Sequence, residues 1–320
     1  MSDPDNYLHR IDPVAGQATF LRSDRQRLVG TPFLDGRTSF SDGPERKLSL
    51  SSLAPAVDAA SPRLIMHMSF CGSTQLAQLI DASGAGLVLK ESQALVDLAD
   101  WHRSLVEQQL SDGRFDAALG AAMALLSRRW NEAPPTVLKP SNWANNLLPD
   151  LLSLAGARAV LVTIEARSFL RAVFRGGRDR LAFTARVAAH LAAATGKPEL
   201  VEAAISEDDD PVDRAARLAL VTHEVQRGLF AQSVGSRCVE IDYALIAAEP
   251  DRALTSAAHA LGLDISDGAA SRAAEERGAR DAKDPARSFS RAGQDAEDAD
   301  VERHHGGRLD AALRWASRTF

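Results

Sequence analysis

The chain is poor in cysteine. Its 320 residues include only Cys71 and Cys238, and both lie in or beside short apolar runs that are typical of buried strands. Free cysteines of this kind indicate a reducing compartment. The first ten residues, MSDPDNYLHR, are acidic and polar and show no signal peptide. We therefore expect a cytoplasmic protein.

Long apolar runs, excess positive charge and metal-ligand clusters are also lacking. No stretch of about 18 apolar residues occurs, so we expect no membrane-spanning helix. The net charge of −6 argues against a general nucleic-acid binder, because a phosphate polyanion needs a basic field, but it allows one local anion site. His304 and His305 would point apart on a helix and have no carboxylate or cysteine cluster beside them, so we expect no metal.

The most informative stretch runs from Arg63 to Asp81, RLIMHMSFCGSTQLAQLID. Leu64–Met68 is a continuous apolar run, typical of a strand buried on both faces of a parallel sheet. Small residues around Gly72 predict a turn, and Thr74–Asp81 has the apolar periodicity of a helix. Such a corner points backbone N–H groups and the positive end of the helix dipole at an anion. We predict a phosphate-type loop, with an ordinary strand–turn–helix corner as the alternative.

Two better-known loops do not fit this stretch. The ATP-binding form, G-x-x-x-x-G-K-[ST], would place its first glycine at His67 and its lysine at Ser73, so only Gly72 and Thr74 agree. The missing lysine is the residue that carries the charge of the β- and γ-phosphates. A cysteine-phosphatase loop needs an arginine six residues after the cysteine, where Ala77 stands. An ATP-dependent kinase is therefore the weakest alternative.

Strand-like and helix-like segments alternate through the middle of the chain. This alternation predicts an α/β fold, a three-layer P-loop-type parallel sheet of about five strands flanked by helices. We expect an N-terminal arm with one or two short strands at 1–60, the α/β core at 61–265, and a charged flap with a terminal helix at 266–320 in the same domain. The longest helix is expected at 212–232, and another at 145–154. The strands are expected near 64–68, 86–89, 136–139, 159–164 and 237–241.

Ligands of a parallel sheet collect at the carboxyl ends of its strands. This rule places the loop Ser69–Thr74, Lys90, Lys139 and the turn Glu165–Arg167 around one crevice. A run of arginines opens the next helix and could clamp an anion, with a solvated helix face as the alternative. These arginines are Arg167, Arg171, Arg175, Arg178 and Arg180.

The loop residues Ser69-Phe70-Cys71-Gly72-Ser73-Thr74 resemble the loop of the sulfotransferase family. There a strand is followed by a basic residue, a small residue, a glycine and two hydroxyl residues. Cys71–Thr74 match this pattern, and Phe70 stands at the basic position. Val239–Leu263 resembles the family's late strand–turn–helix segment, so the likeness spans about 63–263.

The resemblance implies the co-substrate 3′-phosphoadenosine 5′-phosphosulfate and assigns roles to residues of this chain. Ser141 occupies the place of the family's histidine base. Ile164 and Ala172 stand where the family binds the 3′-phosphate with arginine and serine, so Arg167 and Arg175 would have to substitute, with Arg291 from a late basic segment. The expected donor-binding residues are Ser69, Phe70, Cys71, Gly72, Ser73, Thr74, Arg167, Arg175 and Arg291, and the expected catalytic residues are Lys139, Lys90 and Ser141.

Two functions follow from this resemblance. The first is sulfuryl transfer to a hydroxyl or amine of a small-molecule or peptide acceptor, with Glu91 or Glu165 as candidate base. The second is a non-catalytic or repurposed member of the fold that binds a nucleotide or a partner. The altered residues Phe70 and Ser141 motivate the second. Neither involves nucleic acid or a membrane.

Overall fold

The computed structural model describes residues 3–53, 61–130, 133–205, 210–235, 237–277 and 290–320. A five-stranded parallel sheet at its centre has the strand order β5-β6-β4-β7-β8. Four of its strands are buried almost throughout because helices cover both sides, whereas the edge strand β8 exposes Val239, Glu240 and Asp242. This confirms the predicted α/β class and parallel sheet. The strands are β4 (Arg63–His67), β5 (Leu87–Lys90), β6 (Thr136–Lys139), β7 (Arg158–Thr163) and β8 (Cys238–Asp242).

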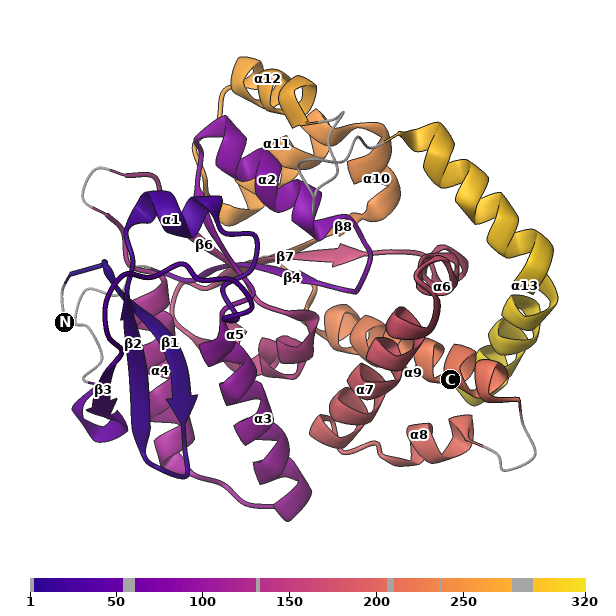
Figure 1. The fold of residues 1–320 in the computed structure, drawn as a ribbon, viewed down its shortest axis with the longest axis horizontal. Helices are drawn as coiled ribbons and strands as arrows, with labels where there is room; N and C mark the ends of the chain where they lie inside the picture. The colour runs from indigo at the N-terminus through magenta and orange to yellow at the C-terminus, as the bar shows by residue number, and fades with distance from the viewer. Residues whose placement is uncertain (1–2, 54–60, 131–132, 206–209, 236, 278–289) are drawn as a thin grey trace.

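Two helical layers enclose the sheet (Figure 1). Above it in this view lie α1 (Arg25–Gly30), α2 (Ser73–Ser83), α10 (Tyr243–Ala248), α11 (Pro250–Leu261) and α12 (Asp267–Arg277). Below it lie α3 (Gln93–Gln108), α4 (Gly113–Leu126), α5 (Leu148–Ser153), α7 (Gly177–Ala194), α8 (Glu199–Ala204) and α9 (Pro211–Ser233). Helix α6 (Ala166–Arg175) follows the carboxyl end of β7.

The N-terminal arm forms a small antiparallel sheet of three strands, one more than the upper expectation. They are β1 (Asn6–Asp12), β2 (Gln17–Arg22) and β3 (Arg46–Ser49). The arm is tied to α3, because the carboxylate of Asp97 accepts hydrogen bonds from Arg10 Nε (2.8 Å) and from the backbone N–H of Ile11 (2.9 Å). It also reaches the central sheet, where the N–H of Leu34 donates to Lys90 O at 2.8 Å.

Two helical expectations were wrong. The segment expected as one helix at 145–154 begins as the 3₁₀ helix η2 (Asn142–Leu147) and becomes α-helical only in α5, whose second residue is Pro149. The longest helix among the described residues is α13 (Arg291–Thr319), not α9. Few apolar residues of this helix are buried, so the apolar residues in its sequence repeat only weakly with the 3.6-residue period of a helix. The buried ones are Val301, Leu309, Ala312 and Ala316.

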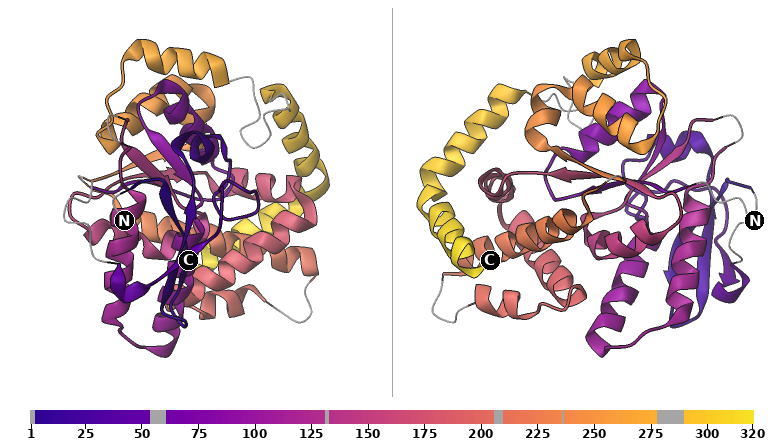
Figure 2. Two further views of the ribbon diagram at one scale, coloured as in Figure 1. Left: turned by 60° about the vertical axis from the view of Figure 1, so that its left-hand side comes forward. Right: turned by 180° about the vertical axis from the view of Figure 1, so that it is seen from behind.

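Helix α13 runs along the outside of the molecule and packs against α6 and α9 (Figure 2). It therefore lies beside the carboxyl ends of β7 and β8, where the predicted crevice is. Among the described residues, no helix combines the length and apolarity that a membrane span requires.

Candidate functional site

The loop between β4 and α2 lies at the carboxyl edge of the central sheet. Gly72 ends it with φ 78°, in the left-handed region that glycine adopts most easily. A Cβ at Gly72 would also lie 3.0 Å from Cδ2 of Tyr243, at the start of α10. Helix α2 begins at the next residue, so the amino end of this helix, with its positive dipole end, faces this edge. The loop has the backbone geometry of an anion site.

Phe70 occupies the position where a basic residue was expected. It also has a positive φ, 62°, which is uncommon for a residue with a bulky side chain. Its ring lies 6.1 Å from that of Phe169 on α6, and the guanidinium carbon of Arg180 lies 4.8 Å from its centroid. The loop thus places an aromatic face, with an arginine over it, at this position.

A buried polar scaffold holds the loop from below. Asn142 Nδ2 donates to Ser69 Oγ at 2.6 Å. Asn145 Nδ2 donates to His67 O at 3.0 Å and to Gln226 Oε1 of α9 at 2.7 Å. Our sequence reasoning missed these three amide side chains. The only signal was the segment Ser141–Asn146, four of whose six residues are polar, shortly after a buried strand. The partner on α9 lies 81 residues away from Asn145.

Cys71 and His67 belong to this buried scaffold. The thiol of Cys71 donates to Met68 O at 2.9 Å, and burial raises its pKa to about 11, so it is a protonated core residue and not a nucleophile at neutral pH. The ring nitrogens of His67 lie 2.8 Å from Met68 O and 2.9 Å from Pro140 O. Burial and the charge of Lys139 lower the His67 pKa to about 3, so the ring is neutral and links β4 to the end of β6.

The two strand-end lysines have different partners, although Lys90 and Lys139 are register neighbours. Lys139 Nζ lies 3.0 Å from Glu91 Oε1, and its side chain is 1% exposed. Its charge lowers the pKa values of Cys71 and His67, and the carbonyl oxygen of the next residue, Pro140, lies 2.9 Å from His67 Nε2, so the end of β6 adjoins the end of β4. Lys90 Nζ instead contacts Asp81 Oδ2 at 2.8 Å and Val29 O at 3.3 Å. The structure therefore brings Lys139, but not the Lys90 ammonium, to the loop.

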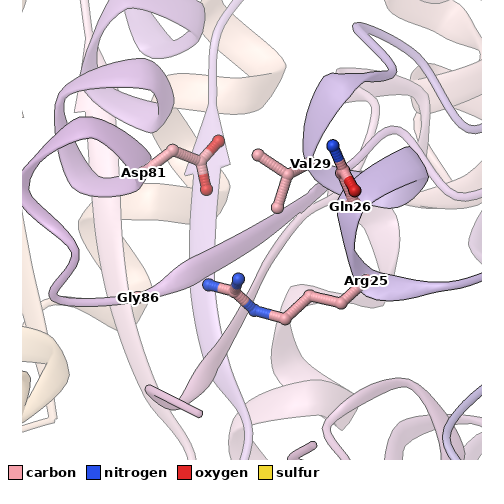
Figure 3. Close-up of a pocket in the computed structure, with 5 residues that line it drawn as sticks. All are labelled: Arg25, Gln26, Val29, Asp81 and Gly86. Carbon is pink, nitrogen blue, oxygen red and sulfur yellow. The ribbon is translucent and has the colours of Figure 1, made fainter.

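Asp81 also lines a pocket of about 400 Å³ between α1 and α2 (Figure 3). Its other oxygen accepts a hydrogen bond from the backbone N–H of Val88 at 2.8 Å. Arg25 extends from the start of α1 toward Gly86, which precedes β5. This pocket therefore lies at the amino end of an edge strand, away from the loop.

Ser141 and Glu165, two residues considered for base chemistry, act as helix caps. Ser141 Oγ accepts from the N–H of Trp143 at 3.4 Å at the start of η2. The two carboxylate oxygens of Glu165 each accept a backbone N–H at 2.8 Å, from Arg167 and Ser168. These hydrogen bonds outweigh the effect of burial, so the pKa of Glu165 is lowered.

The arginines of α6 meet carboxylates of α13. Arg167 forms a two-bond contact with Glu302, at 2.8 and 2.7 Å, and a 2.6 Å contact with Asp310. Arg175 pairs with Asp298, and its Nε lies 3.5 Å from Glu297. Both expected phosphate-binding arginines thus lie against anions of the chain itself. The third, Arg291, is the first residue of α13, but its side chain is outside the described part of the structure.

A pocket of about 420 Å³ lies between the loop, α6, α10 and α13. Helix α13 closes it on one side, where Tyr243 Oη and the Gln294 amide contact each other at 2.9 and 3.2 Å. Its charged lining consists of two arginines and three carboxylates, so it combines anion-binding groups with competing negative charge. The lining includes Phe70, Ile164, Ala172, Arg171, Arg175, Asp295, Asp298 and Glu302.

Among the described residues, no group of three or more histidine, cysteine, aspartate or glutamate side chains is arranged to hold a metal ion. The site chemistry available from these residues is therefore that of backbone N–H groups, Lys139 paired with Glu91, and the arginines around the pocket. Such groups bind and stabilise anions.

Comparison with known proteins gave few matches. No family model matches the chain, and the search of curated proteins found none that matches. A sulfotransferase domain from the curacin biosynthetic pathway is 10% identical with a TM-score of 0.39, covering 65% of this chain and 76% of that one. The sulfotransferase domain of the Synechococcus PCC 7002 olefin synthase is 12% identical with a TM-score of 0.41, covering 76% and 90%. The chain is thus distantly similar in structure to two sulfotransferase domains.

Proposed function

We propose that this protein transfers a sulfuryl group from 3′-phosphoadenosine 5′-phosphosulfate to a hydroxyl or amine of a small-molecule or peptide acceptor. The observation that carries the proposal is the loop Ser69–Thr74, which aims the amino end of α2 at the carboxyl edge of the sheet with Lys139 beside it. The lysine that an ATP loop needs at Ser73 is absent, which favours a donor whose 5′ end carries less negative charge than a triphosphate.

In this proposal the backbone N–H groups of the loop hold the 5′-phosphosulfate. The acceptor atom forms a bond to sulfur while the bond between sulfur and the 5′-phosphate oxygen breaks, and the departing bisphosphate keeps the electron pair. Lys139 offsets the charge that develops on that oxygen. Catalysis is then mainly positioning and electrostatic stabilisation, as in phosphoryl transfer.

The proton of the acceptor needs a base, and Glu91 is the better of the two candidates. Its Oε1 lies 3.0 Å from Lys139 Nζ, at the end of the strand next to β6. Glu165 uses both carboxylate oxygens to cap α6. Ser141, in the cap of η2, is a poor base and has a positioning role here.

The 3′-phosphate would contact Arg167, Arg175 and Arg291. The first two pair with Glu302, Asp310 and Asp298, so a bound bisphosphate has to displace these carboxylates. In this proposal the loop binds the donor without rearrangement. The arginines of α6 bind it only after the α13 carboxylates have moved away from them.

This exchange supports a second candidate function, a repurposed protein that binds an anion or a partner and transfers nothing. In that case the carboxylates of α13 would stay paired with Arg167 and Arg175, and the pocket would hold a ligand smaller than the bisphosphate. The weaker third possibility, an ATP-dependent kinase, has no comparable support.

A turnover assay separates the first two functions. The protein is incubated with the sulfuryl donor and a panel of phenols, alcohols and amines, and release of 3′,5′-bisphosphate is measured. The proposal predicts acceptor-dependent release that falls at least about tenfold in Lys139→Ala, the loss typical of a deleted electrostatic group. Donor binding without release for any acceptor class would favour the repurposed protein.

A further inference from the structure

A second pocket lies in the helical layer below the sheet. Its volume is about 350 Å³, which is in the range of small-molecule sites. Residues of α3, η2, α5, α7, α8 and α9 line it, and the α-helices of this group lie below the central sheet in Figure 1. We call it the lower pocket. It shares no lining residue with the pocket of about 420 Å³ beside the loop.

Asn146 brings a hydrogen-bond acceptor to the wall of the lower pocket. This residue of η2 is only 3% exposed. Its Nδ2 donates to Ala99 O at 3.0 Å and lies 3.2 Å from Nδ1 of His102. Its Oδ1 has no hydrogen-bond partner among the described residues. A buried acceptor in this state lowers stability unless a donor reaches it, so this wall favours a ligand that donates a hydrogen bond.

His102 and Asp150 set the electrostatics of the same wall. Because Asn146 Nδ2 is a donor, His102 Nδ1 is the acceptor, and this network assigns the ring proton to Nε2, which lies 3.5 Å from Asp150 Oδ2. Burial lowers the pKa of His102, so the ring is neutral at pH 7. Burial also raises the pKa of Asp150; His102 opposes this shift and the charge of Asp116 adds to it. A cation beside Asp150 would offset both the burial and the repulsion.

The other charged residues of the lining are already paired or are exposed to water. Glu224 Oε1 lies 2.9 Å from His223 Nδ1, and its Oε2 accepts from Arg227 Nε at 2.7 Å. Lys197 is exposed, where water and salt screen its charge. An acidic residue in the first turn of a helix is expected from the helix dipole alone, so Asp150 by itself marks no site. It becomes informative because it lies at a cavity together with Asn146.

The rest of the wall is mainly apolar, and a glycine keeps it open. Leu200, Val225 and Leu229 come from α8 and α9. Gly228 lies inside α9, and a Cβ there would have no neighbouring atom within 4 Å. Glycine within a helix is less stable than alanine, and neither a left-handed backbone nor a close contact requires it at this position. What Gly228 provides is open space on this wall of the pocket.

We propose that the lower pocket binds an organic amine with an apolar body. The ammonium group pairs with Asp150, Asn146 Oδ1 is the second acceptor, and the apolar body lies along Val225 and Leu229 beside Gly228. Hydrogen bonds between an ammonium group and a carboxylate are of the strong, charge-assisted kind, and apolar contact adds to them. The net charge of −6 also favours a cation. Amine binding here is independent of sulfuryl transfer, because no residue lines both pockets.

Calorimetric titration of the full chain with three probes of similar shape tests the preference for a cation. The probes are 2-phenylethylamine, 2-phenylethanol and 3-phenylpropionate, which end in an ammonium group, a hydroxyl and a carboxylate. The amine should bind at least about tenfold more tightly than the other two, as expected for a charge-assisted hydrogen bond. Asp150→Asn should remove this preference. Asp251→Asn is the matched control, because Asp251 also follows a proline in the first turn of a helix, but in α11 above the sheet.

A second variant tests the space in the pocket. Gly228→Leu should weaken both the amine and the alcohol at least about tenfold, because the added side chain occupies their volume. Gly120→Leu is its control, since Gly120 lies inside α4, away from the lower pocket, and a Cβ there also has no neighbouring atom within 4 Å. All four variants should bind adenosine 3′,5′-bisphosphate like the wild type. Circular dichroism and the melting temperature establish that each is folded; Asp150→Asn carries the test if Gly228→Leu is not.

Three results would overturn the amine site. The first is a wild type that binds the carboxylate or the alcohol as tightly as the amine. The second is undiminished amine binding in a folded Asp150→Asn or Gly228→Leu variant, which would place the amine elsewhere on the protein. The third is a wild type that binds none of the probes at millimolar concentration.

Discussion

The two sides of the candidate pocket are built in different ways. On one side the β4–α2 loop is held by buried hydrogen bonds from Asn142 and Asn145, and it presents backbone N–H groups. On the other side the arginines of α6 are partly exposed and pair with carboxylates of α13. Buried hydrogen bonds fix the geometry of the loop side, whereas the arginines of α6 are already paired with carboxylates of the chain itself.

This difference has an energetic basis. Buried hydrogen bonds such as those of Asn142 and Asn145 are costly to disturb and keep one geometry. Ion pairs between partly exposed side chains are individually weak and are screened by salt. An anionic ligand can therefore exchange with the α13 carboxylates at modest cost, but it has to accept the loop as it is. Changes on the loop side should consequently have the larger effects.

The largest effect is expected from Lys139→Ala. Lys139 is buried and pairs with Glu91 at 3.0 Å, so its removal takes the nearest cation from a largely buried carboxylate and should destabilise the fold by about 3 kcal/mol. Denaturant unfolding measures this loss. Adding Glu91→Gln should recover part of the stability but none of the turnover. A stable, fully active Lys139→Ala variant would show that the loop side does not depend on this charge.

Gly72→Ala should cost roughly 1–3 kcal/mol and abolish measurable bisphosphate binding. The substitution puts a side chain at φ 78° and a Cβ 3.0 Å from Tyr243. Gly84→Ala is the matched control, because Gly84 has φ 72° at the end of the same helix, but a Cβ there would have no atom within 4 Å. It should lose about 1 kcal/mol and bind normally. Equal binding by both variants would remove the loop from the site.

Neutralising the α13 carboxylates should have a smaller effect of the opposite sign. Asp298→Asn with Glu302→Gln removes the shortest contact of Arg175 and one of the two carboxylate partners of Arg167, which keeps Asp310. Affinity for adenosine 3′,5′-bisphosphate should then rise about three- to tenfold at low salt, in keeping with partly exposed ion pairs. Glu297→Gln, which alters a longer contact of 3.5 Å, is the control. Lower affinity in the double variant would mean that these carboxylates support the ligand site instead of competing with the ligand.

The smallest effect concerns pH. The hydrogen bond from Arg167 lowers the pKa of Glu302 below its ordinary value of 4.5. Glu302 therefore binds a proton more readily in the unfolded chain than in the folded protein. The contribution of the Arg167–Glu302 pair to the free energy of unfolding is fully present above about pH 4.5 and is lost as the pH falls through the lower pKa of the folded protein. The melting-temperature difference between the wild type and Glu302→Gln should shrink over that acidic range. A difference independent of pH would argue against the pair.

Local sequence patterns were enough to predict the sheet and the loop. Continuous apolar runs such as Leu64–Met68 and the small residues around Gly72 depend on nearest neighbours in the chain, and the structure forms the strand, turn and helix there. The same local pattern identified Lys139 at the end of a buried strand, where the structure has it. These features follow from periodicity and backbone chemistry.

Other features depended on contacts that no local pattern contains. Lys90 turns to Asp81 and Val29 because the N-terminal arm packs on the edge of β5. The α13 carboxylates lie 122 residues or more from the arginines they meet. Arg180 reaches Phe70 only because Gly176 leaves room. Tertiary packing decides each of these, so the sequence could identify the charged residues but not their partners.

The most direct test of the loop as a sulfuryl-donor site is calorimetric titration of the wild type with adenosine 3′,5′-bisphosphate, run beside ATP with magnesium. Our account predicts binding of the bisphosphate in the micromolar range, loss of this binding in Gly72→Ala but not in Gly84→Ala, and no binding of ATP. Absence of bisphosphate binding, or equal binding of ATP, would contradict it.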